Sequence, residues 1–320
     1  MNLKQLQYFV RIVECGSLAK ASRQLYIAQP ALSQQLSKLE EEVGKTLLIR
    51  SAKGVVPTPN GAALLQHARF MLRQLEQALV IARQEPGSIQ GMVSVGLAST
   101  TLCALGAPLM RRMRDKYPGI ILNIVEGLSG HIAQMMRLTQ LDLAILFGHD
   151  AAPDLPHESL LEEDLFLMLP QDSPMVSQRR KSIRCDEVAQ LPLILPTGIH
   201  GLRRRIAHEF DQRNLQMNVV AEIDSLSLLL LCVKDGMGAT IKPISATMME
   251  DRLATDLRHL PISDAQLKRP NYLFSTEHER LTPATIAVHT EIKETVKFLV
   301  DSGQWRGVQL TEKIKHAAGM

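Results

Sequence analysis

Four polar residues share one face of a short predicted helix near the N-terminus and could read nucleic acid. They are Gln29, Ser33, Gln34 and Lys38. A glutamine amide can pair with the edge of adenine, a serine hydroxyl with several bases, and a lysine with phosphate or guanine. The opposite face of this helix is apolar and is expected to be buried, through Ala31, Leu32, Leu36 and Leu39. The alternative is a three-helix bundle whose glutamines are only solvated.

The residues around this face have the arrangement of a helix-turn-helix. Gly16 and Ser17 end a first helix, and Ser17 is placed to cap a short helix over residues 18–26. After a tight turn, Pro30 falls in the first turn of the next helix, where its missing N–H costs nothing. Gly44 ends that helix. We therefore expect a helix-turn-helix over about Leu18 to Ser37.

A small hairpin with basic residues is expected to follow. Residues 46–58 alternate in polarity and turn at residues 52–54, and the tip carries Arg50 and Lys53. Cations on a projecting loop suit contact with the DNA backbone or minor groove. Residues 1–85 contain 11 Lys and Arg against 6 Asp and Glu, whereas the remainder contains 25 against 27. The positive excess lies in the first quarter, where a polyanionic partner is therefore expected.

Thr58 and Pro59 begin a long predicted helix that ends before residues 86–88. Apolar residues recur along it at alternating steps of four and three, namely Leu64, Ala68, Met71, Leu75 and Ala78. A second stripe beside them contains Leu65, Leu72 and Leu79. Because a small domain offers little surface to bury both stripes, we expect this helix to pair with a second chain. The alternative is packing against the C-terminal domain of the same chain.

From residue 90 onward, strand and helix patterns alternate. Strands are predicted at 92–97, 120–126, 141–147, 165–169, 193–195, 219–223, 239–241 and 271–275. Helices are predicted at about 102–116, 130–139, 201–213, 225–235, 244–250 and 283–302. This alternation predicts a mainly parallel sheet, or two such sheets in linked lobes.

The N-terminal segment is similar to the DNA-binding domain of LysR-type transcriptional regulators. The likeness runs in order from Leu-x-x-Phe through Gly-Ser, Gln-Pro-Ala-Leu-Ser, Leu-Glu and Leu-Leu-x-Arg to Thr-Pro-x-Gly. Residues 163–167 and 235–243 extend it to about residue 300. The run Ile-Ala-Gln-Pro-Ala-Leu-Ser-Gln-Gln resembles the subgroup of nitrogen assimilation control regulators. Ala28 is a departure, because most members have a capping Ser there and its loss costs about 1 kcal/mol.

This resemblance implies a domain organisation and a mode of assembly. A winged helix-turn-helix is expected over 1–58, a dimerisation helix over 59–88, and a two-lobed α/β effector domain like periplasmic binding proteins over 89–302. Lobe I would take about 89–163 and 268–302, lobe II about 164–267, and a C-terminal tail 303–320. The family members are usually homotetramers that bind and bend promoter DNA. RNA polymerase is a further expected partner if the protein is an activator.

The resemblance also implies a small-molecule effector in the cleft between the lobes. The rule that ligands bind at the carboxyl ends of parallel strands points to the same places. The candidates are Ser99, Thr100, Thr101, Ser129 and Phe147 in the first lobe and Thr197, His200, Arg203 and Ser225 in the second. Hydroxyls and helix N-termini suit an anion, with Arg203 as its countercharge. The alternatives are that the hydroxyls only cap helices and that Arg203 lies on a solvated surface.

Motifs of catalysis and of metal binding are missing from the sequence. It contains no Gly-x-Ser-x-Gly, no P-loop and no His-Glu-x-x-His, so we expect no enzyme, cofactor or metal site. Cys15, Cys103, Cys185 and Cys232 are scattered, which favours reduced thiols over a disulfide framework or redox pair. The longest apolar run is far shorter than the ~20 residues that span a bilayer. A cytoplasmic protein with no membrane partner is therefore expected.

Taken together, these patterns predict a bacterial, sequence-specific transcriptional regulator of the LysR type that is controlled by a small, anionic effector. Two alternatives remain at this point. One is a small-molecule-binding protein or enzyme whose N-terminal domain serves only for assembly. The other is a regulator that has no effector and is controlled by its abundance.

Overall fold

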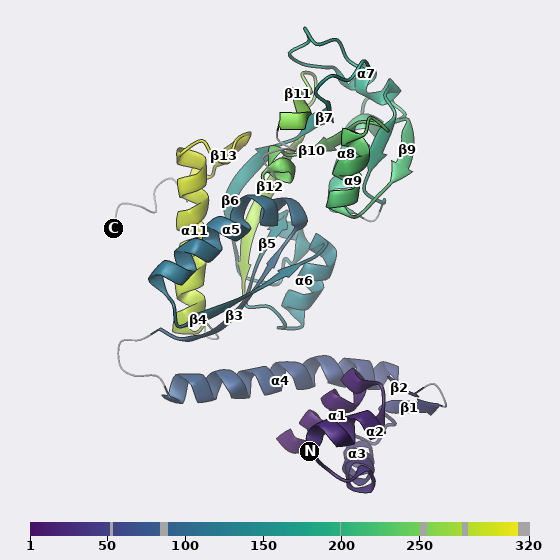
Figure 1. The fold of residues 1–320 in the computed structure, drawn as a ribbon, viewed down its shortest axis with the longest axis vertical. Helices are drawn as coiled ribbons and strands as arrows, with labels where there is room; N and C mark the ends of the chain where they lie inside the picture. Colours follow the sequence, from purple (N-terminus) through teal and green to yellow (C-terminus); the bar gives the residue numbers. More distant parts are fainter. Residues whose placement is uncertain (52–53, 84–88, 199, 250–254, 277–280, 313–320) are drawn as a thin grey trace. The chain divides into compact units, whose positions relative to one another are not determined.

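The computed structural model describes residues 1–51, 54–83, 89–198, 200–249, 255–276 and 281–312 (Figure 1). The chain divides into two compact units. The first is Met1–Gly91 together with Leu138–Gln140, and the second is Met92–Arg137 together with Leu141–Met320. Each unit has its own hydrophobic core. Among the described residues, no helix combines the length and the hydrophobicity of a membrane span.

The first unit consists of helices and one hairpin. Its elements are α1 (Leu3–Cys15), α2 (Leu18–Leu25), α3 (Gln29–Val43), β1 (Leu48–Ser51), β2 (Gly54–Pro57) and α4 (Pro59–Arg83). The β1 and β2 strands pair antiparallel. These elements confirm the predicted helix-turn-helix and hairpin. Ala31 was wrongly predicted to be buried: it is exposed, because Leu32, Leu36 and Leu39 alone fill the inner face of α3.

Side chains from the first three helices form one core in this unit. Phe9, Ile12, Leu32 and Leu39 are each at most 1% exposed, and burying such a side chain stabilises a fold by roughly 1.5–3 kcal/mol. The α3 helix is also tied to the hairpin, because the Glu40 carboxylate accepts hydrogen bonds from the N–H groups of Leu47 (2.7 Å) and Leu48 (3.2 Å). The helix and the hairpin therefore hold a fixed relation to one another.

Lobe I of the second unit is a six-stranded sheet with helices on both faces. The strand order is β13-β6-β12-β5-β3-β4. The strands are β3 (Gly91–Leu97), β4 (Ile120–Glu126), β5 (Leu143–Phe147), β6 (His157–Asp164), β12 (Lys268–Ser275) and β13 (Val308–Leu310). The helices are α5 (Ser99–Lys116), α6 (Ser129–Arg137), the short 3-10 turn η1 (His149–Ala151) and α11 (Pro283–Asp301).

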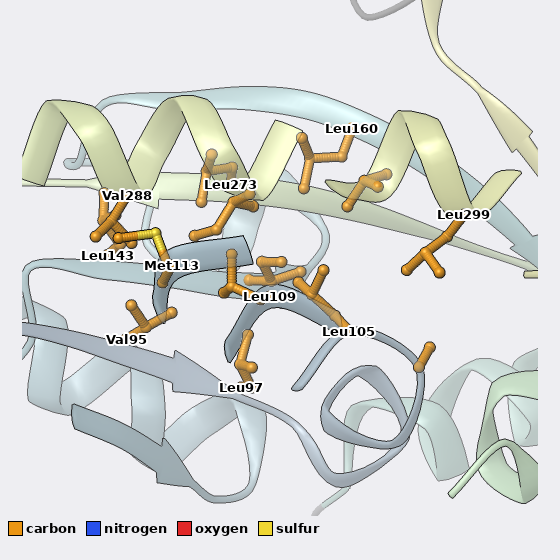
Figure 2. Packing of buried hydrophobic residues seen from close by; sticks show 14 of the residues in the cluster. Val95, Leu97, Leu105, Leu109, Met113, Leu143, Leu160, Leu273, Val288 and Leu299 are labelled. Atoms are coloured by element: carbon orange, nitrogen blue, oxygen red, sulfur yellow. The ribbon is translucent and has the colours of Figure 1, made fainter. Parts of the chain in front are cut away.

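Alternate residues of these strands face two different cores. Figure 2 shows Val95, Leu143 and Leu273 of the sheet packed with Leu109 of α5 and Val288 of α11. On the other side, Ala144 and Leu146 pack against Ile132 and Met136 of α6. The sheet is therefore buried on both faces, as strands with continuous apolar runs require.

Lobe II is built from shorter elements. They are β7 (Phe166–Pro170), α7 (Cys185–Gln190), β8 (Leu193–Leu195), α8 (Gly201–Asp211), β9 (Val219–Glu222), α9 (Leu226–Lys234), β10 (Thr240–Lys242), η2 (Ile244–Thr247) and β11 (Leu257–Pro261). The β10, β7 and β11 strands form an antiparallel sheet, and β8 and β9 pair parallel. The α8 and α9 helices contribute to separate cores.

The predicted mainly parallel sheets and the predicted C-terminal tail were both wrong. The sheet of lobe I is mixed, because β12 pairs antiparallel with both β5 and β6, and the sheet of β10, β7 and β11 in lobe II is antiparallel. Residues 303–320 are not a tail along their whole length. Trp305 is only 2% exposed and belongs to the core of lobe I, and β13 pairs with β6, so the folded part extends at least to Leu310.

Candidate nucleic-acid interface and ligand cleft

The α3 helix presents the predicted polar face to solvent. Gln29, Gln34 and Lys38 are exposed and Ser33 is half-buried. The Ser17 hydroxyl caps α2 by accepting from the Lys20 N–H, as predicted. The N-cap position of α3 holds Ala28, which has no side-chain acceptor to offer the first N–H groups of the helix.

The β1–β2 hairpin, called the wing here, contacts this face through a hydrogen bond. The Arg50 guanidinium on β1 donates from Nη1 to the Ser33 hydroxyl oxygen over 3.2 Å. Lys53, the second predicted wing cation, lies outside the described residues. The bond places an exposed cation next to the polar face of α3. A surface of amides and cations of this kind can bind both base edges and phosphates.

The α4 helix packs in part against its own chain, which corrects part of the predicted interface. Ala68 is fully buried in a small core with Leu6 and Val10 of α1, and Leu64 packs against the same core. The first half of the predicted apolar stripe of α4 therefore packs against α1 of the same chain. Met71 remains 42% exposed, and Ala78 is also exposed. Leu75 lines a groove of about 390 Å³ that α4 forms with α1 and α2.

Three cavities meet at Phe147 in the cleft between the two lobes. The smallest, about 20 Å³, is called the inner cavity here; it is lined by Ser99 and Thr100 from α5 and by His200, Asp224, Lys242 and Arg269. A cavity of about 540 Å³, the outer cavity, is lined by Ser129, Phe147, His200 and Arg204, among others. A third, of about 510 Å³, is lined by Phe147, Arg204, Arg205 and Arg269. Polar and charged groups therefore surround the cleft.

The structure brings some of the predicted effector residues to these cavities. Ser99, Thr100, Phe147 and His200 line the inner cavity, and Ser129 lines the outer one with a buried hydroxyl that has no hydrogen-bond partner.

The other predicted residues have different surroundings. The Thr197 hydroxyl donates to Asp224 (3.0 Å), and Ser225 caps α9 by accepting from the Leu228 N–H. Thr101 is fully buried. Arg203 does not line any of the three cavities, and its Nε is buried without a hydrogen-bond partner among the described residues.

Two buried cations in the cleft were missed by sequence reasoning. Arg269 is 3% exposed; its Nε donates to Glu163 (3.0 Å), its Nη2 donates to Thr100 (2.9 Å), and its Cζ lies 3.7 Å from the centroid of the Phe147 ring. Lys242, at the end of β10, is 5% exposed. A lysine inside the otherwise apolar run Ala-Thr-Ile-Lys-Pro was a usable signal, because a strand this short and apolar is a core strand.

Burial changes the protonation of this cleft. It lowers the pKa of Lys242 to about 7; the nearby Arg269 guanidinium acts in the same direction and the Asp224 carboxylate in the opposite one. It lowers the pKa of His200 to about 4, with a further contribution from Lys242. His200 is therefore neutral at physiological pH, whereas Lys242 is divided between its two forms.

The four cysteines, all of which the structure describes, form no disulfide bond. Cys185 is fully buried, and burial raises the pKa of its thiol to about 12. A thiol with so high a pKa is a poor nucleophile. Among the described residues, no cluster of three His, Cys, Asp or Glu side chains could hold a metal ion.

Comparison with known proteins gives matches over both units. Residues 3–62 match the family model of the bacterial regulatory helix-turn-helix protein, lysR family, and residues 86–297 match that of the LysR substrate binding domain. The nitrogen assimilation regulatory protein nac of Escherichia coli (strain K12) is 38% identical over 247 residues, which are 77% of this chain and 79% of that protein. The nac protein of Klebsiella aerogenes is similar to the same degree.

Solved structures show the same fold over nearly the whole chain. An OxyR mutant of Corynebacterium glutamicum with bound H2O2 is 27% identical with a TM-score of 0.54, covering 94% of this chain and 97% of that one. Full-length CbnR in complex with its target DNA is 20% identical with a TM-score of 0.70, covering 92% of this chain and 100% of that one.

Proposed function

This chain belongs to the LysR family of DNA-binding bacterial transcriptional regulators with an effector-binding domain, and from that premise we propose how its residues perform the function. The α3 helix reads promoter DNA, the β1–β2 hairpin holds the backbone, and the distal part of α4 joins two chains. A small anionic effector in the inter-lobe cleft changes the geometry of the bound oligomer. The protein remains in the cytoplasm.

The observation that carries the DNA-binding part is the exposed face of α3 beside Arg50. Gln29 and Gln34 are exposed amides on a helix whose other face is fully packed, so their side chains are available for base edges. Ser33 contributes a hydroxyl whose orientation is set by Arg50. Lys38, Arg50 and Lys53 supply charge for phosphates. Base contacts supply the specificity, and phosphate contacts supply most of the salt-dependent affinity.

Assembly rests on the part of α4 that its own chain leaves uncovered. Met71 and Ala78 are exposed, and Leu79 is 48% exposed. Apolar residues at these spacings on one helix favour pairing with a second helix. A dimer presents two copies of α3, which suits two half-sites about one helical turn of DNA apart. We propose that two such dimers form a homotetramer, which contacts RNA polymerase if the protein is an activator.

The effector part rests on the cavities around Phe147. Ser99, Thr100 and Phe147 come from lobe I and His200 from lobe II, and all four line the inner cavity. A ligand that contacts both lobes can favour one lobe arrangement over another, provided that its affinity for the two arrangements differs. By favouring one lobe arrangement, such a ligand would change the spacing between the α3 helices of the paired chains.

The test uses the full-length chain and the DNA upstream of its own gene. Fluorescence anisotropy should show binding to a limited set of sequences, with an affinity that falls steeply and log-linearly with salt. Footprinting should show two protected half-sites. Binding that is equal for all sequences, or that is absent at low salt, would contradict the proposal.

A further inference from the structure

The segment that follows α11 folds back onto lobe I. Its Trp305 is 2% exposed, packs in the core of that lobe and donates its backbone N–H to the Leu299 carbonyl over 2.8 Å. Further along, β13 pairs with β6, and the Thr311 hydroxyl donates to the Ser159 carbonyl over 2.7 Å. We call residues 302–311 the C-terminal strap. The match to the LysR substrate binding domain ends at residue 297, so the strap lies beyond it.

The strap touches the point at which the chain passes from lobe I to lobe II. The β6 strand ends at Asp164 and β7 begins at Phe166, and the Asp164 N–H donates to the Gly307 carbonyl over 2.9 Å. Gly307 has a φ of 69°, and a Cβ added to it would lie 2.9 Å from the Phe166 ring and 3.2 Å from the Ile244 side chain. Phe166 and Ile244 belong to lobe II. Glycine suits this left-handed and crowded position, because any larger residue would push on the lobe connection.

A buried carboxylate joins the strap to both passages between the lobes. Glu163, next to the outgoing passage, accepts from the Trp305 indole N–H (3.2 Å) and from the Ser245 hydroxyl of η2 (2.6 Å). It also accepts from Arg269 (3.0 Å), near the start of β12, the strand by which the chain returns to lobe I. Separating these groups would leave buried polar atoms unpaired, which is costly. The strap is therefore fastened at the hinge between the lobes.

The same carboxylate is linked to the ligand cleft through Arg269. The Nη2 of Arg269 donates to the Thr100 hydroxyl (2.9 Å), and its Cζ lies 3.7 Å from the centroid of the Phe147 ring. All three residues line the inner cavity. A movement of Glu163 would therefore displace a cation of the cleft. Strap, hinge and cleft are joined by a continuous chain of contacts, which can carry coupling between them.

We infer that the C-terminal strap restrains the hinge between the two lobes. Trp305 holds the carboxylate at the hinge, and Gly307 packs against the side chains with which lobe II begins to fold. The free-energy difference between lobe arrangements therefore depends on the strap, and so does the difference in affinity that a ligand needs in order to shift them. This inference deepens the proposed function, on which it rests, by naming the segment that regulates the response of the cleft.

The test compares two glycine substitutions with the same backbone strain. Gly303 and Gly307 both lie in the strap, with φ of 70° and 69°, but a Cβ added to Gly303 would meet no atom of the described residues within 4 Å. Gly303→Ala is therefore the matched control for Gly307→Ala, which also crowds Phe166. Trp305→Phe is an independent variant that removes the indole N–H and keeps an aromatic ring. Hydrogen exchange of the full-length proteins, without ligand, is followed by mass spectrometry.

Peptides over residues 160–168 and 240–248 contain the hinge contacts. They should exchange about tenfold faster in Gly307→Ala than in Gly303→Ala, because the hinge opens locally more often. Trp305→Phe should show a smaller increase over wild type in the same peptides. Peptides from the lobe cores, over residues 93–97 and 202–210, should keep their wild-type rates in all three variants.

Equal exchange of the hinge peptides in the two glycine variants would overturn the inference. So would an increase that is as large in the core peptides as in the hinge peptides, because it would show that the strap stabilises the whole unit and not the hinge. If Gly307→Ala does not fold, the comparison of Trp305→Phe with wild type decides by the same criteria.

DNA binding separates this inference from the proposed function. The strap lies outside the DNA-binding unit, so all three variants should protect the wild-type half-sites. If wild type binds no DNA while the hinge peptides respond as expected, the proposed function fails and the restraint by the strap stands. If DNA binding is normal and the hinge peptides of the two glycine variants exchange equally, only the restraint fails.

Discussion

The guanidinium of Arg269 pairs with the carboxylate of Glu163 in the interior of lobe I, with Nε donating to Oε2 over 3.0 Å. Glu163 has no exposed surface. Its second oxygen accepts from the Ser245 hydroxyl (2.6 Å) and from the Trp305 indole N–H (3.2 Å). The pair therefore joins β6 and β12, the strands next to the connections between lobes, to η2 and to the segment before β13. A fully hydrogen-bonded pair is the form in which buried charges are tolerated.

Removing one member of this pair should be strongly destabilising. Glu163→Gln leaves the Arg269 guanidinium without a countercharge, and breaking a buried pair in this way costs about 3–5 kcal/mol. Glu162→Gln is the matched control, because the Glu162 side chain is 46% exposed and lies 3.7 Å from Lys268. An exposed pair contributes about 0–1 kcal/mol. Urea unfolding measures the loss of stability in each variant. Equal losses in Glu163→Gln and Glu162→Gln would show that the buried pair contributes no more than the exposed one.

Arg50→Ala should weaken DNA binding on every sequence. The guanidinium is exposed and contacts Ser33, so the substitution removes a cation from the phosphate-binding surface and frees the serine hydroxyl. The slope of log K against log salt should fall by about 0.9 for each phosphate that the variant no longer neutralises. Arg114→Ala, on α5 in the other unit and paired with Asp115, is the control that should leave the slope unchanged. A change of sequence preference with an unchanged slope would place Arg50 on a base instead.

Leu75→Glu should dissociate the oligomer. Leu75 lies between Met71 and Ala78 on α4, where the chain leaves the helix partly uncovered, and an unpaired charge in a helix interface costs several kcal/mol. Sedimentation velocity should show a smaller species, with weaker binding to two half-sites. Ala63→Glu, at an exposed position of the same helix, should have no such effect. Because Leu75 also lines a groove with α1, the Tm is measured too; an unchanged oligomer at an unchanged Tm would contradict the prediction.

Lys242→Met replaces the buried ammonium group by an uncharged side chain of similar length. The free energy of unfolding that it gains over wild type should depend on pH. Burial, together with the nearby Arg269, lowers the pKa of Lys242 from 10.5 to about 7 although the Asp224 carboxylate opposes this shift. Between these values the unfolded chain binds more protons than the folded one, so the stability of wild type rises with pH. The penalty is complete below pH 7 and disappears toward pH 10.5. The advantage of Lys242→Met in urea unfolding should accordingly be largest at pH 6 and smaller at pH 9. An advantage that is constant over this range would contradict a titrating ammonium.

The DNA-binding elements could be predicted from sequence because their signals are local. Ser17 as a cap, Pro30 in a first turn and Gly44 as a terminator all act on residues a few positions away. The β6 strand was missed, since its sequence is rich in acidic residues and reads as a solvated segment. Glu163 is buried in it only because Arg269, 106 positions later, supplies the countercharge. The residues of the ligand cleft are likewise brought together from distant parts of the sequence.

The sequence predicted cleft residues at strand and helix ends, and four of them, Ser99, Thr100, Phe147 and His200, line the inner cavity. Arg203 follows a helix N-terminus in sequence, yet it does not line any of the three cavities, whereas Lys242 and Arg269 do. Which side of α8 or β10 faces the cleft depends on how the two lobes pack, and this information is not present in the local pattern. The apolar stripe of α4 also depends on packing between distant segments, because Ala68 is buried by α1 of its own chain.

The measurement that tests the central claim most directly is the sequence preference of Gln34→Ala. Gln34 is exposed on α3 and its amide is assigned to a base edge. Selection from a randomised DNA library, followed by footprinting, should show that preference is relaxed at one or two positions of each half-site. Discrimination against the wrong base should fall by about 1–3 kcal/mol. The salt slope should be that of wild type. An unchanged preference and an unchanged footprint would show that α3 does not read the DNA.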